Sequence, residues 1–344
     1  MLPETLSSFA PKLLEPSANT AVAQAVLRGL GSQPRSLAPW LFYDQRGSDL
    51  FERITGLAEY YLTRLERGIF AAHSEAILRA ANARHQRLTM IELGAGSASK
   101  TCLLLQAALK QQLSVAYCAL DVSPSALAEA AERIGQAMPS LAVTTHVVNY
   151  TQDLSALAAA PTAEPANHGQ IQSKMVLWIG SSIGNFEPTE AQALLTKIRA
   201  QLRPGDSLLL GADFAPSPHK PISTLLRAYQ DADGVTADFN RNALVRINHE
   251  LGANFCPEAF THEVRWSAEQ ARLEMHLMSR TRQQVEVPAL GLRLNFSAGE
   301  SIHTENSYKF TPECMLDILL QAGFTRVEQW TDPRHWFGVW LAKL

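Results

Sequence analysis

The sequence predicts an α/β fold built on a doubly wound, mostly parallel β-sheet. The segment 90–100, MIELGAGSASK, is typical of an apolar strand, a tight glycine turn and the start of a helix. The segment 117–121, YCALD, is typical of a second apolar strand, and it ends in a carboxylate. Between about residues 63 and 218, short apolar segments alternate with amphipathic helical patterns. This alternation indicates a parallel sheet that is covered on both faces.

The elements of this region follow one another in regular order. Hydrophobic periodicity predicts helices over 67–81, 100–109, 124–138 and 189–202. Between them it predicts buried strands over 88–93, 115–121, 142–148, 174–179 and 207–212. We expect a surface loop over 158–167, which is rich in proline, alanine and asparagine, and a turn over 203–206, RPGD.

The pattern changes after residue 218. The segment 222–251 is helical in pattern, and polar and apolar residues then alternate as in antiparallel strands over 263–266, 272–282 and 284–287. A helix over 312–322 and two strands over 325–329 and 337–342 follow, and they would complete the first sheet. We therefore expect two units. The sheet domain takes 65–219 plus 310–344, and a second, α+β lobe takes 1–64 plus 220–309.

The composition limits the classes of protein. Of the 344 residues, 46% are hydrophobic and 18% are charged, which predicts a globular protein with a well-buried core. The net charge of −3 gives no electrostatic indication of a nucleic-acid partner. The chain has no apolar run long enough to span a membrane, and its first residues lack the pattern of a signal peptide. The four cysteines are scattered singly and the histidines lack metal-ligand spacing, so we expect no disulfide, no metal and a reduced, cytoplasmic enzyme. We also expect a monomer.

The glycine turn indicates a nucleoside ligand. Gly94 and Gly96 would let the backbone approach a ligand closely, and Asp121 could bind ribose hydroxyls. Ser99 stands where a dinucleotide fingerprint has its third glycine. The spacing from Glu92 through the two glycines resembles the cofactor loop of class I S-adenosylmethionine (AdoMet) methyltransferases, in which an acid near the loop faces the cationic methionine end of the ligand. An ordinary glycine-rich strand–helix turn is the alternative.

Further motifs make the resemblance specific. They are 41–51 (LFYDQRGSDLF), 59–64 (EYYLTR), 180–186 (GSSIGNF), 239–242 (FNRN), 304–310 (TENSYKF) and 330–333 (WTDP). Together with the cofactor loop, this set is similar to the histidine-specific N-methyltransferase family, whose bacterial members act in the ergothioneine pathway. The resemblance covers nearly the whole chain. It implies trimethylation of the α-amino group of L-histidine to hercynine (histidine betaine).

The resemblance also implies an AdoMet site at particular positions. Gly94, Lys100 and Asp121 match family positions that contact AdoMet. Asn149 and Tyr150 match the pair that flanks the adenine, although the family commonly has an acid at the first of these. The carbonyl oxygen of Asn149 can still accept a hydrogen bond from the adenine amino group.

A histidine pocket is implied in the same way. The matching positions carry polar or aromatic side chains and one methionine: Tyr60, Asn185, Tyr229, Met275, Glu305 and Ser307, with Tyr43 near the reacting amine. Asn185 and Tyr229 can donate hydrogen bonds to a carboxylate. Glu305 can accept an imidazole N–H, and Ser307 can donate or accept at the ring. A substrate side chain that left the buried carboxylate of Glu305 without a hydrogen-bond partner would bind about 1–3 kcal/mol more weakly. The pocket would therefore select histidine.

Simpler interpretations remain open beside these roles. Tyr60 can pack between the lobes, Asn185 can cap the turn after its strand, and Met275 can be a core residue. Another function on the same fold is methylation of a different amine, such as a tryptophan derivative or a thiohistidine. A non-catalytic AdoMet-binding partner protein is a further alternative. No residue stands out as a general base, because this methyl transfer needs alignment and the exclusion of water more than proton chemistry.

Overall fold

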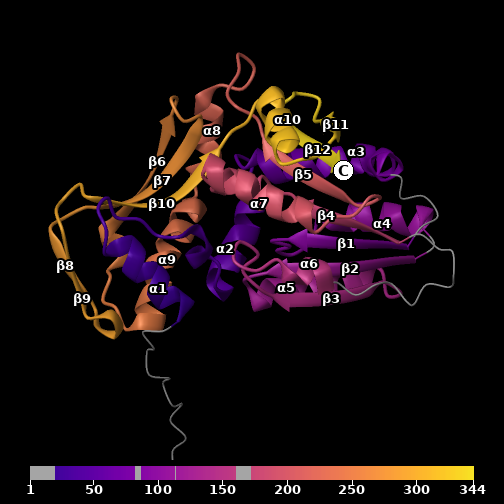
Figure 1. The fold of residues 1–344 in the computed structure, drawn as a ribbon. Helices are drawn as coiled ribbons and strands as arrows, with labels where there is room; N and C mark the ends of the chain where they lie inside the picture. The colour runs from indigo at the N-terminus through magenta and orange to yellow at the C-terminus, as the bar shows by residue number, and fades with distance from the viewer. Residues whose placement is uncertain (1–19, 82–86, 113, 160–171) are drawn as a thin grey trace, which may run out of the picture.

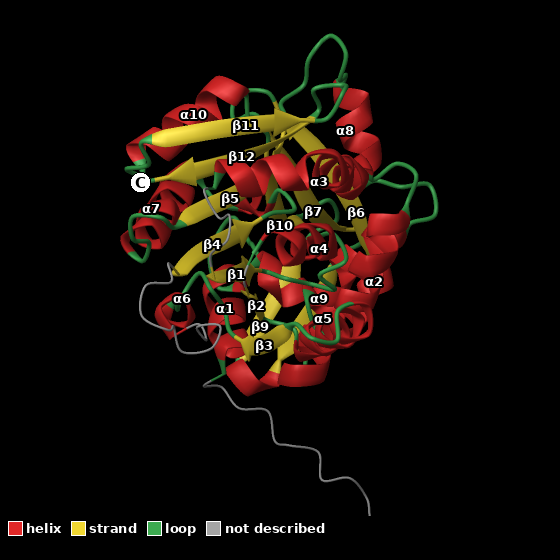
Figure 2. Cartoon of the chain, turned by 90° about the vertical axis from the view of Figure 1, so that its right-hand side faces the viewer, coloured by secondary structure: helices red, strands yellow, loops and turns green. Residues whose placement is uncertain are grey.

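A seven-stranded sheet forms the centre of the computed structural model, which describes residues 20–81, 87–112, 114–159 and 172–344. The strand order is β11-β12-β5-β4-β1-β2-β3, from the top of Figure 2 to the bottom. Five strands run parallel: β1 (Arg87–Leu93), β2 (Ser114–Asp121), β3 (Ala142–Val147), β4 (Gln172–Trp178) and β5 (Ser207–Asp213). The hairpin of β11 (Arg326–Thr331) and β12 (Phe337–Lys343) closes the edge at β5. The predicted doubly wound sheet is confirmed.

Helices cover both faces of this sheet (Figure 2). One layer contains α3 (Tyr61–Ala80), α4 (Thr101–Gln111) and α5 (Pro124–Ala137), and the other contains α6 (Ser155–Ala159), α7 (Pro188–Ala200) and α10 (Pro312–Gln321). Strand side chains alternate between the layers, so Met90 packs into the first and Ile91 into the second. Both faces are therefore apolar, which explains the continuous apolar segments in the sequence.

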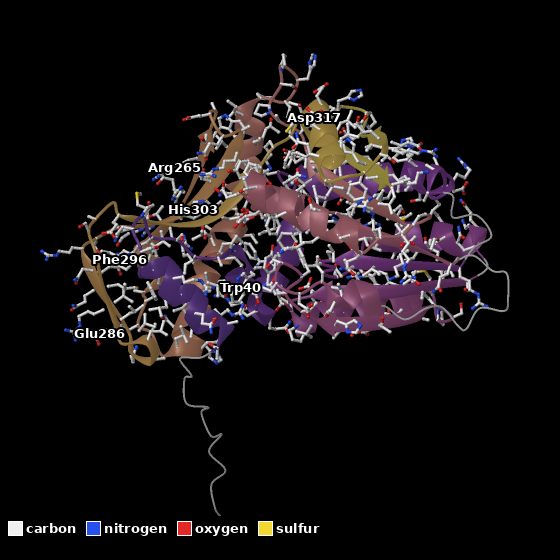
Figure 3. All side chains as sticks on the ribbon, viewed as in Figure 1. Trp40, Arg265, Glu286, Phe296, His303 and Asp317 are labelled. Carbon is white, nitrogen blue, oxygen red and sulfur yellow. The ribbon has the colours of Figure 1, made fainter. Side chains whose placement is uncertain are left out.

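Two smaller sheets form on the left side of Figure 1. The antiparallel sheet β10-β7-β6 contains β6 (Phe260–Ser267), β7 (Arg272–Ser279) and β10 (Ser301–Tyr308). The other sheet is the hairpin of β8 (Gln283–Val287) and β9 (Leu292–Phe296). Figure 3 marks the first by Arg265 and His303, and the second by Glu286 and Phe296. The division of the chain into two units at the boundaries given above stays a prediction.

Helices accompany these smaller sheets. They are α1 (Ala21–Leu30), α2 (Gln45–Gly56), α8 (Ile222–Tyr229) and α9 (Val235–Leu251), with short 3-10 helices η1 (Pro39–Phe42), η2 (Ser182–Asn185), η3 (Pro257–Ala259) and η4 (Pro288–Leu290). Within the described ranges, each helix is too short or too polar to cross a lipid bilayer.

Several element boundaries differ from the expectation. The helix expected over 222–251 is interrupted, because the Asp231 carboxylate accepts the amides of Val235 and Thr236 and so starts α9. The helix expected from 67 already begins at Tyr61, and the strand expected over 272–282 ends at Ser279. Strands β9 and β10 were not predicted. In the expected loop 158–167, residues 158–159 belong to α6, and the rest lies outside the described residues.

The parallel strands bring their carboxyl ends to one edge of the sheet. The loops after β1, β2 and β4 all leave from this edge. From β1 the chain adds β2 and β3 on one side and then β4 and β5 on the other, so the strand order reverses between β1 and β4. Crevices of this kind are where open α/β sheets bind ligands.

Candidate functional site

A cavity of about 560 Å³ lies at this edge of the sheet. Its volume falls in the range of small-molecule sites. The turn between β1 and α4 lines it, and there Gly94 and Gly96 have φ values of 70° and 51°. These positive values suit glycine, which has no Cβ to clash. The amide of Gly94 donates to the carbonyl oxygen of Leu120 at 2.8 Å, which ties the turn to β2.

Asp121 faces the same turn from the end of β2. Its carboxylate accepts the amide of Gly96 through Oδ2 and the amide of Ser123 through Oδ1, each at 2.9 Å. Burial raises the pKa of Asp121, and these backbone hydrogen bonds oppose the increase. Each carboxylate oxygen keeps a further lone pair. Because Asp121 lines the cavity, it is placed to accept two neighbouring hydroxyls of a ribose.

Lys100 is held by a buried acid that was not predicted as part of the site. Its Nζ forms an ion pair with Glu66, which lies on α3 and is fully buried. Both oxygens of Glu66 also accept the amide of Gly180, at 2.9 and 3.0 Å. Glu66 therefore joins the start of α4 to the turn after β4. Glu66 lies just before the helix that was expected from residue 67, and an acid at the start of a helix looks solvent-exposed in sequence, so the local pattern gave no indication of this role.

Two further expected positions lie on the cavity wall. The Oδ1 of Asn149 accepts the amide of Thr151 at 3.1 Å and its hydroxyl at 2.7 Å, so both carbonyl lone pairs are used. An adenine amino group could bind Asn149 only if the Thr151 hydroxyl turned away, and this contact stays a prediction. The ring of Tyr150 packs edge-on against Trp178 with centroids 6.5 Å apart.

The acid that precedes the glycine turn also lines the cavity. Glu92 accepts the hydroxyls of Thr101 at 2.7 Å and Tyr117 at 2.5 Å. Burial raises the pKa of Glu92 to about 7, although both hydrogen bonds act in the opposite direction. It is placed to face a cationic group in the cavity.

A second cavity of about 60 Å³ adjoins the first. All seven residues expected in a histidine pocket line it: Tyr43, Tyr60, Asn185, Tyr229, Met275, Glu305 and Ser307. Three of them, Tyr43, Tyr60 and Asn185, also line the large cavity. The other four line the small cavity alone. The two cavities therefore share one wall, and the ring-binding candidates lie away from it.

Aromatic rings form much of the small cavity, including two that were not expected there, Phe51 and Phe239. Tyr43 packs edge-to-face on Phe239 with centroids 5.4 Å apart, and Tyr60 on Tyr229 at 6.0 Å. Burial raises the pKa of both Tyr43 and Tyr60 well above its usual value, and nearby acids add to this. Both phenols are therefore neutral at ordinary pH. Their faces attract a cationic group, and their hydroxyls can orient an amine.

Glu305 is the acid of this pocket. It lies on β10 and is 8% exposed, and its carboxylate makes no hydrogen bond or ion pair to any residue in the described part of the chain. Burial raises its pKa to about 8, even though the charge of Lys309 lowers it. A buried acid without a protein partner is costly, so its position beside the cavity indicates a ligand group as its partner.

The two hydroxyls of the pocket are part of a buried charge cluster. The Oη of Tyr229 and the Oγ of Ser307 lie 2.9 Å apart. Lys309 donates to both, at 3.0 and 2.9 Å, and forms an ion pair with Asp213 at 2.9 Å. Asp213 also pairs with Lys220 at 2.5 Å. Burial alone would raise the pKa of Asp213, but the two lysines outweigh it and lower this pKa.

Lys309, Asp213 and Lys220 were not predicted as members of the site. Lys309 stood in a quoted motif without a role, and Asp213 ends an otherwise apolar strand. An ionisable residue at the end of a buried strand was the available signal. Among the described residues, no group of histidine, cysteine, aspartate and glutamate side chains is arranged to hold a metal ion.

Known proteins are similar to this chain over almost its full length. Residues 22–344 match the family described as histidine-specific methyltransferase, SAM-dependent. A protein named histidine N-alpha-methyltransferase from Mycolicibacterium smegmatis is 39% identical, over 97% of this chain and 98% of the relative. Its namesake from Mycobacterium tuberculosis is 38% identical with the same coverage. Ergothioneine biosynthesis protein 1 of Neurospora crassa is 31% identical, over 90% of this chain and 33% of that protein.

The large cavity fits the cofactor of this family. The bare glycine turn admits a ligand closely, Asp121 can accept ribose hydroxyls, and Glu92 is placed for the cationic end of AdoMet. The order of the seven strands is that of the class I AdoMet-dependent fold, with β12 as the antiparallel strand between β5 and β11. The chain belongs to the family of histidine-specific, AdoMet-dependent methyltransferases.

Proposed function

We propose that this enzyme methylates the α-amino group of L-histidine three times and produces hercynine for ergothioneine biosynthesis. The observation that carries the proposal is the shared wall of the two cavities. A histidine whose ring reaches Glu305 and Ser307 would have its backbone end at Tyr43, Tyr60 and Asn185. That end faces the cavity that fits AdoMet. The relatives named for histidine methylation and ergothioneine biosynthesis support the same substrate and pathway.

The proposed cofactor contacts follow the wall of the large cavity. Gly94 lets AdoMet approach the backbone, Asp121 binds its ribose, and Asn149 and Tyr150 flank its adenine. Lys100 lines the cavity while Glu66 holds its ammonium, so it acts from a fixed position. AdoMet supplies an electrophilic methyl group on a sulfonium.

The chain's contribution to the reaction is alignment. Asn185 and Tyr229 donate hydrogen bonds to the histidine carboxylate, and Met275 packs beside the substrate. The neutral hydroxyls of Tyr43 and Tyr60 accept hydrogen bonds from the α-amino group and turn its lone pair toward the methyl donor. The aromatic walls exclude water from the amine. Holding two reactants in line in this way removes much of the entropic part of the barrier.

Successive transfers require a loosely held amine, because its N–H donors disappear as methyl groups arrive. The shared wall of the two cavities fits this requirement, since it consists mostly of aromatic rings and neutral polar groups. Among the described residues that line the small cavity, Glu305 is the one acid, and it lies on the side away from AdoMet. A methylated ammonium would still be attracted by the ring faces.

Compartment and assembly complete the proposal. All four cysteines are free thiols, which suits the reducing cytoplasm. We expect a monomer with two lobes, 65–219 plus 310–344 and 1–64 plus 220–309. Sedimentation at several concentrations would measure the assembly state.

Mass spectrometry tests the substrate and the product together. The enzyme is incubated with AdoMet and each of the twenty amino acids. We expect histidine to gain three methyl groups and tryptophan to remain unmodified. A monomethylated end product after many turnovers would contradict the trimethylation, and faster methylation of another amino acid would contradict the substrate. Thermal shift with S-adenosylhomocysteine should show a larger shift when histidine is also present.

A further inference from the structure

Lys309 holds both hydroxyls of the substrate pocket on one ammonium. An ammonium has three N–H donors and no acceptor. Lys309 donates to Tyr229 Oη at 3.0 Å and to Ser307 Oγ at 2.9 Å, and it forms an ion pair with Asp213 Oδ2 at 2.9 Å. Its side chain is fully buried, so water does not compete for these protons. Tyr229 and Ser307 must therefore each accept a hydrogen bond from Lys309.

The two hydroxyls also share a proton with each other. Their oxygens lie 2.9 Å apart, which is hydrogen-bond distance. Lys309 keeps both oxygens in place, so without a proton between them two lone pairs would face each other. One hydroxyl must donate to the other. The pair then has one proton and one lone pair left for a ligand, on different residues.

We infer that Lys309 makes Ser307 an obligate hydrogen-bond acceptor toward the substrate ring, so that the pocket requires a ring N–H at that point. The inference rests on the proposed function, in which Tyr229 donates its proton to the histidine carboxylate. Ser307 then donates to Tyr229 and receives from Lys309, which leaves it a single lone pair. Lys309 is a positioning residue, because it acts on the substrate through these two hydroxyls.

Because Ser307 can only accept a hydrogen bond from the ring, it places a second requirement on the substrate, in addition to the one set by the acid Glu305. A ring that presents a bare nitrogen to Ser307 would place two lone pairs against each other. Protonated imidazole satisfies the site because it carries one N–H toward Ser307 and a second N–H toward Glu305, which lines the same cavity. An unmet polar contact of this kind should weaken binding by about tenfold or more.

Two of the thiazolylalanine isomers, those linked through ring carbon C4 or C5, test this hydrogen-bond direction. Both have a five-membered ring with one nitrogen and no N–H, and they place that nitrogen at either of the two imidazole nitrogen positions. Isothermal titration in the presence of S-adenosylhomocysteine gives their dissociation constants relative to histidine. In the unmodified enzyme we expect histidine to bind about tenfold or more tightly than either isomer.

Tyr229→Phe provides the decisive comparison. It removes the hydroxyl to which Ser307 donates, so Ser307 can turn its proton toward a bare ring nitrogen. All amino acids should bind more weakly, but the preference for histidine over one isomer should fall about fivefold or more. Lys309→Met should reduce the same preference, because the two oxygens can then separate. Tyr61→Phe is the matched control, since it removes a hydrogen bond to Asp213 and leaves the hydroxyl pair intact.

Each outcome is decisive. If Tyr229→Phe kept the full preference for histidine over both isomers, the inference would be overturned. This result would hold even if Lys309→Met misfolded and so failed to bind S-adenosylhomocysteine. An unmodified enzyme that bound histidine and both isomers equally would also overturn it. If the unmodified enzyme bound S-adenosylhomocysteine but no histidine, the proposed function would fail and the inference with it. If the enzyme bound histidine but bound a thiazolylalanine isomer equally well, the inference would be refuted while the proposed function would stand.

Discussion

Glu305→Gln should stabilise the ligand-free enzyme while it weakens histidine binding. The glutamine keeps the size of the side chain but cannot ionise. Glu305 is buried, lacks a partner among the described residues, and has a pKa of about 8 against the usual 4.5. Its neutral form is therefore favoured in the folded state. Between these two pKa values, the unfolded chain releases a proton that the folded enzyme retains.

The size of the effect follows from this difference. One pKa unit corresponds to about 1.4 kcal/mol, so at pH 7 the retained proton lowers the free energy of unfolding by about 3 kcal/mol at most. The stability is fully present below about pH 4.5 and is lost as the pH rises to about 8. The glutamine variant lacks this dependence. Any cost of burying the amide is the same at every pH, so the change with pH isolates the ionisation of Glu305.

Urea denaturation between pH 5 and pH 8 measures the difference. The stability of Glu305→Gln relative to the unmodified enzyme should grow by about 2–4 kcal/mol over this range. The exposed Glu328→Gln serves as the control. Histidine affinity should fall about tenfold, because the amide of glutamine makes a weaker hydrogen bond to the ring than an ionised Glu305 does. A stability difference that stays constant from pH 5 to pH 8 would refute the reasoning.

Three other substitutions test separate parts of the site. Asp121→Asn should weaken S-adenosylhomocysteine binding about tenfold to a hundredfold and leave histidine affinity nearly unchanged in calorimetry, whereas equal losses would argue against two distinct cavities. Glu66→Gln should lower the free energy of unfolding by up to about 3 kcal/mol in urea and weaken AdoMet binding, because Lys100 loses its charge partner. Unchanged AdoMet affinity would contradict the role of Glu66 in holding Lys100 at the cavity. Asn185→Ala should raise the KM for histidine about tenfold, and an unchanged KM would favour a simple turn-capping role.

The layered sheet could be predicted because its pattern is local. Segments such as 88–93 and 207–212 are buried on both faces, so their apolar character is continuous along the chain. β10 escaped prediction for the opposite reason. Its segment 304–307 is polar in sequence yet buried in the structure, because the side chains face a pocket and a charge cluster rather than solvent. Local hydrophobicity carries no signal for such a strand.

The candidate site divides in the same way. Tyr60, Glu305 and the other nominated residues followed from motifs, and they line the expected cavities. Glu66 and Lys309 could not be assigned from the sequence, since their roles depend on partners more than 30 and 90 residues away, Lys100 and Asp213. Ion pairs between distant segments leave no periodicity to read.

The sequence by itself determined where the strands of the large sheet lie along the chain, the glycine turn and the kinds of side chain available for chemistry, because burial periodicity and backbone freedom are properties of neighbouring residues. Only the tertiary structure decided which charges are buried together, which protons the hydroxyls can offer, and how far the pKa of Glu305 rises. These quantities depend on the loss of water around groups brought together from distant parts of the chain. Desolvation of that kind exists only once the fold has closed.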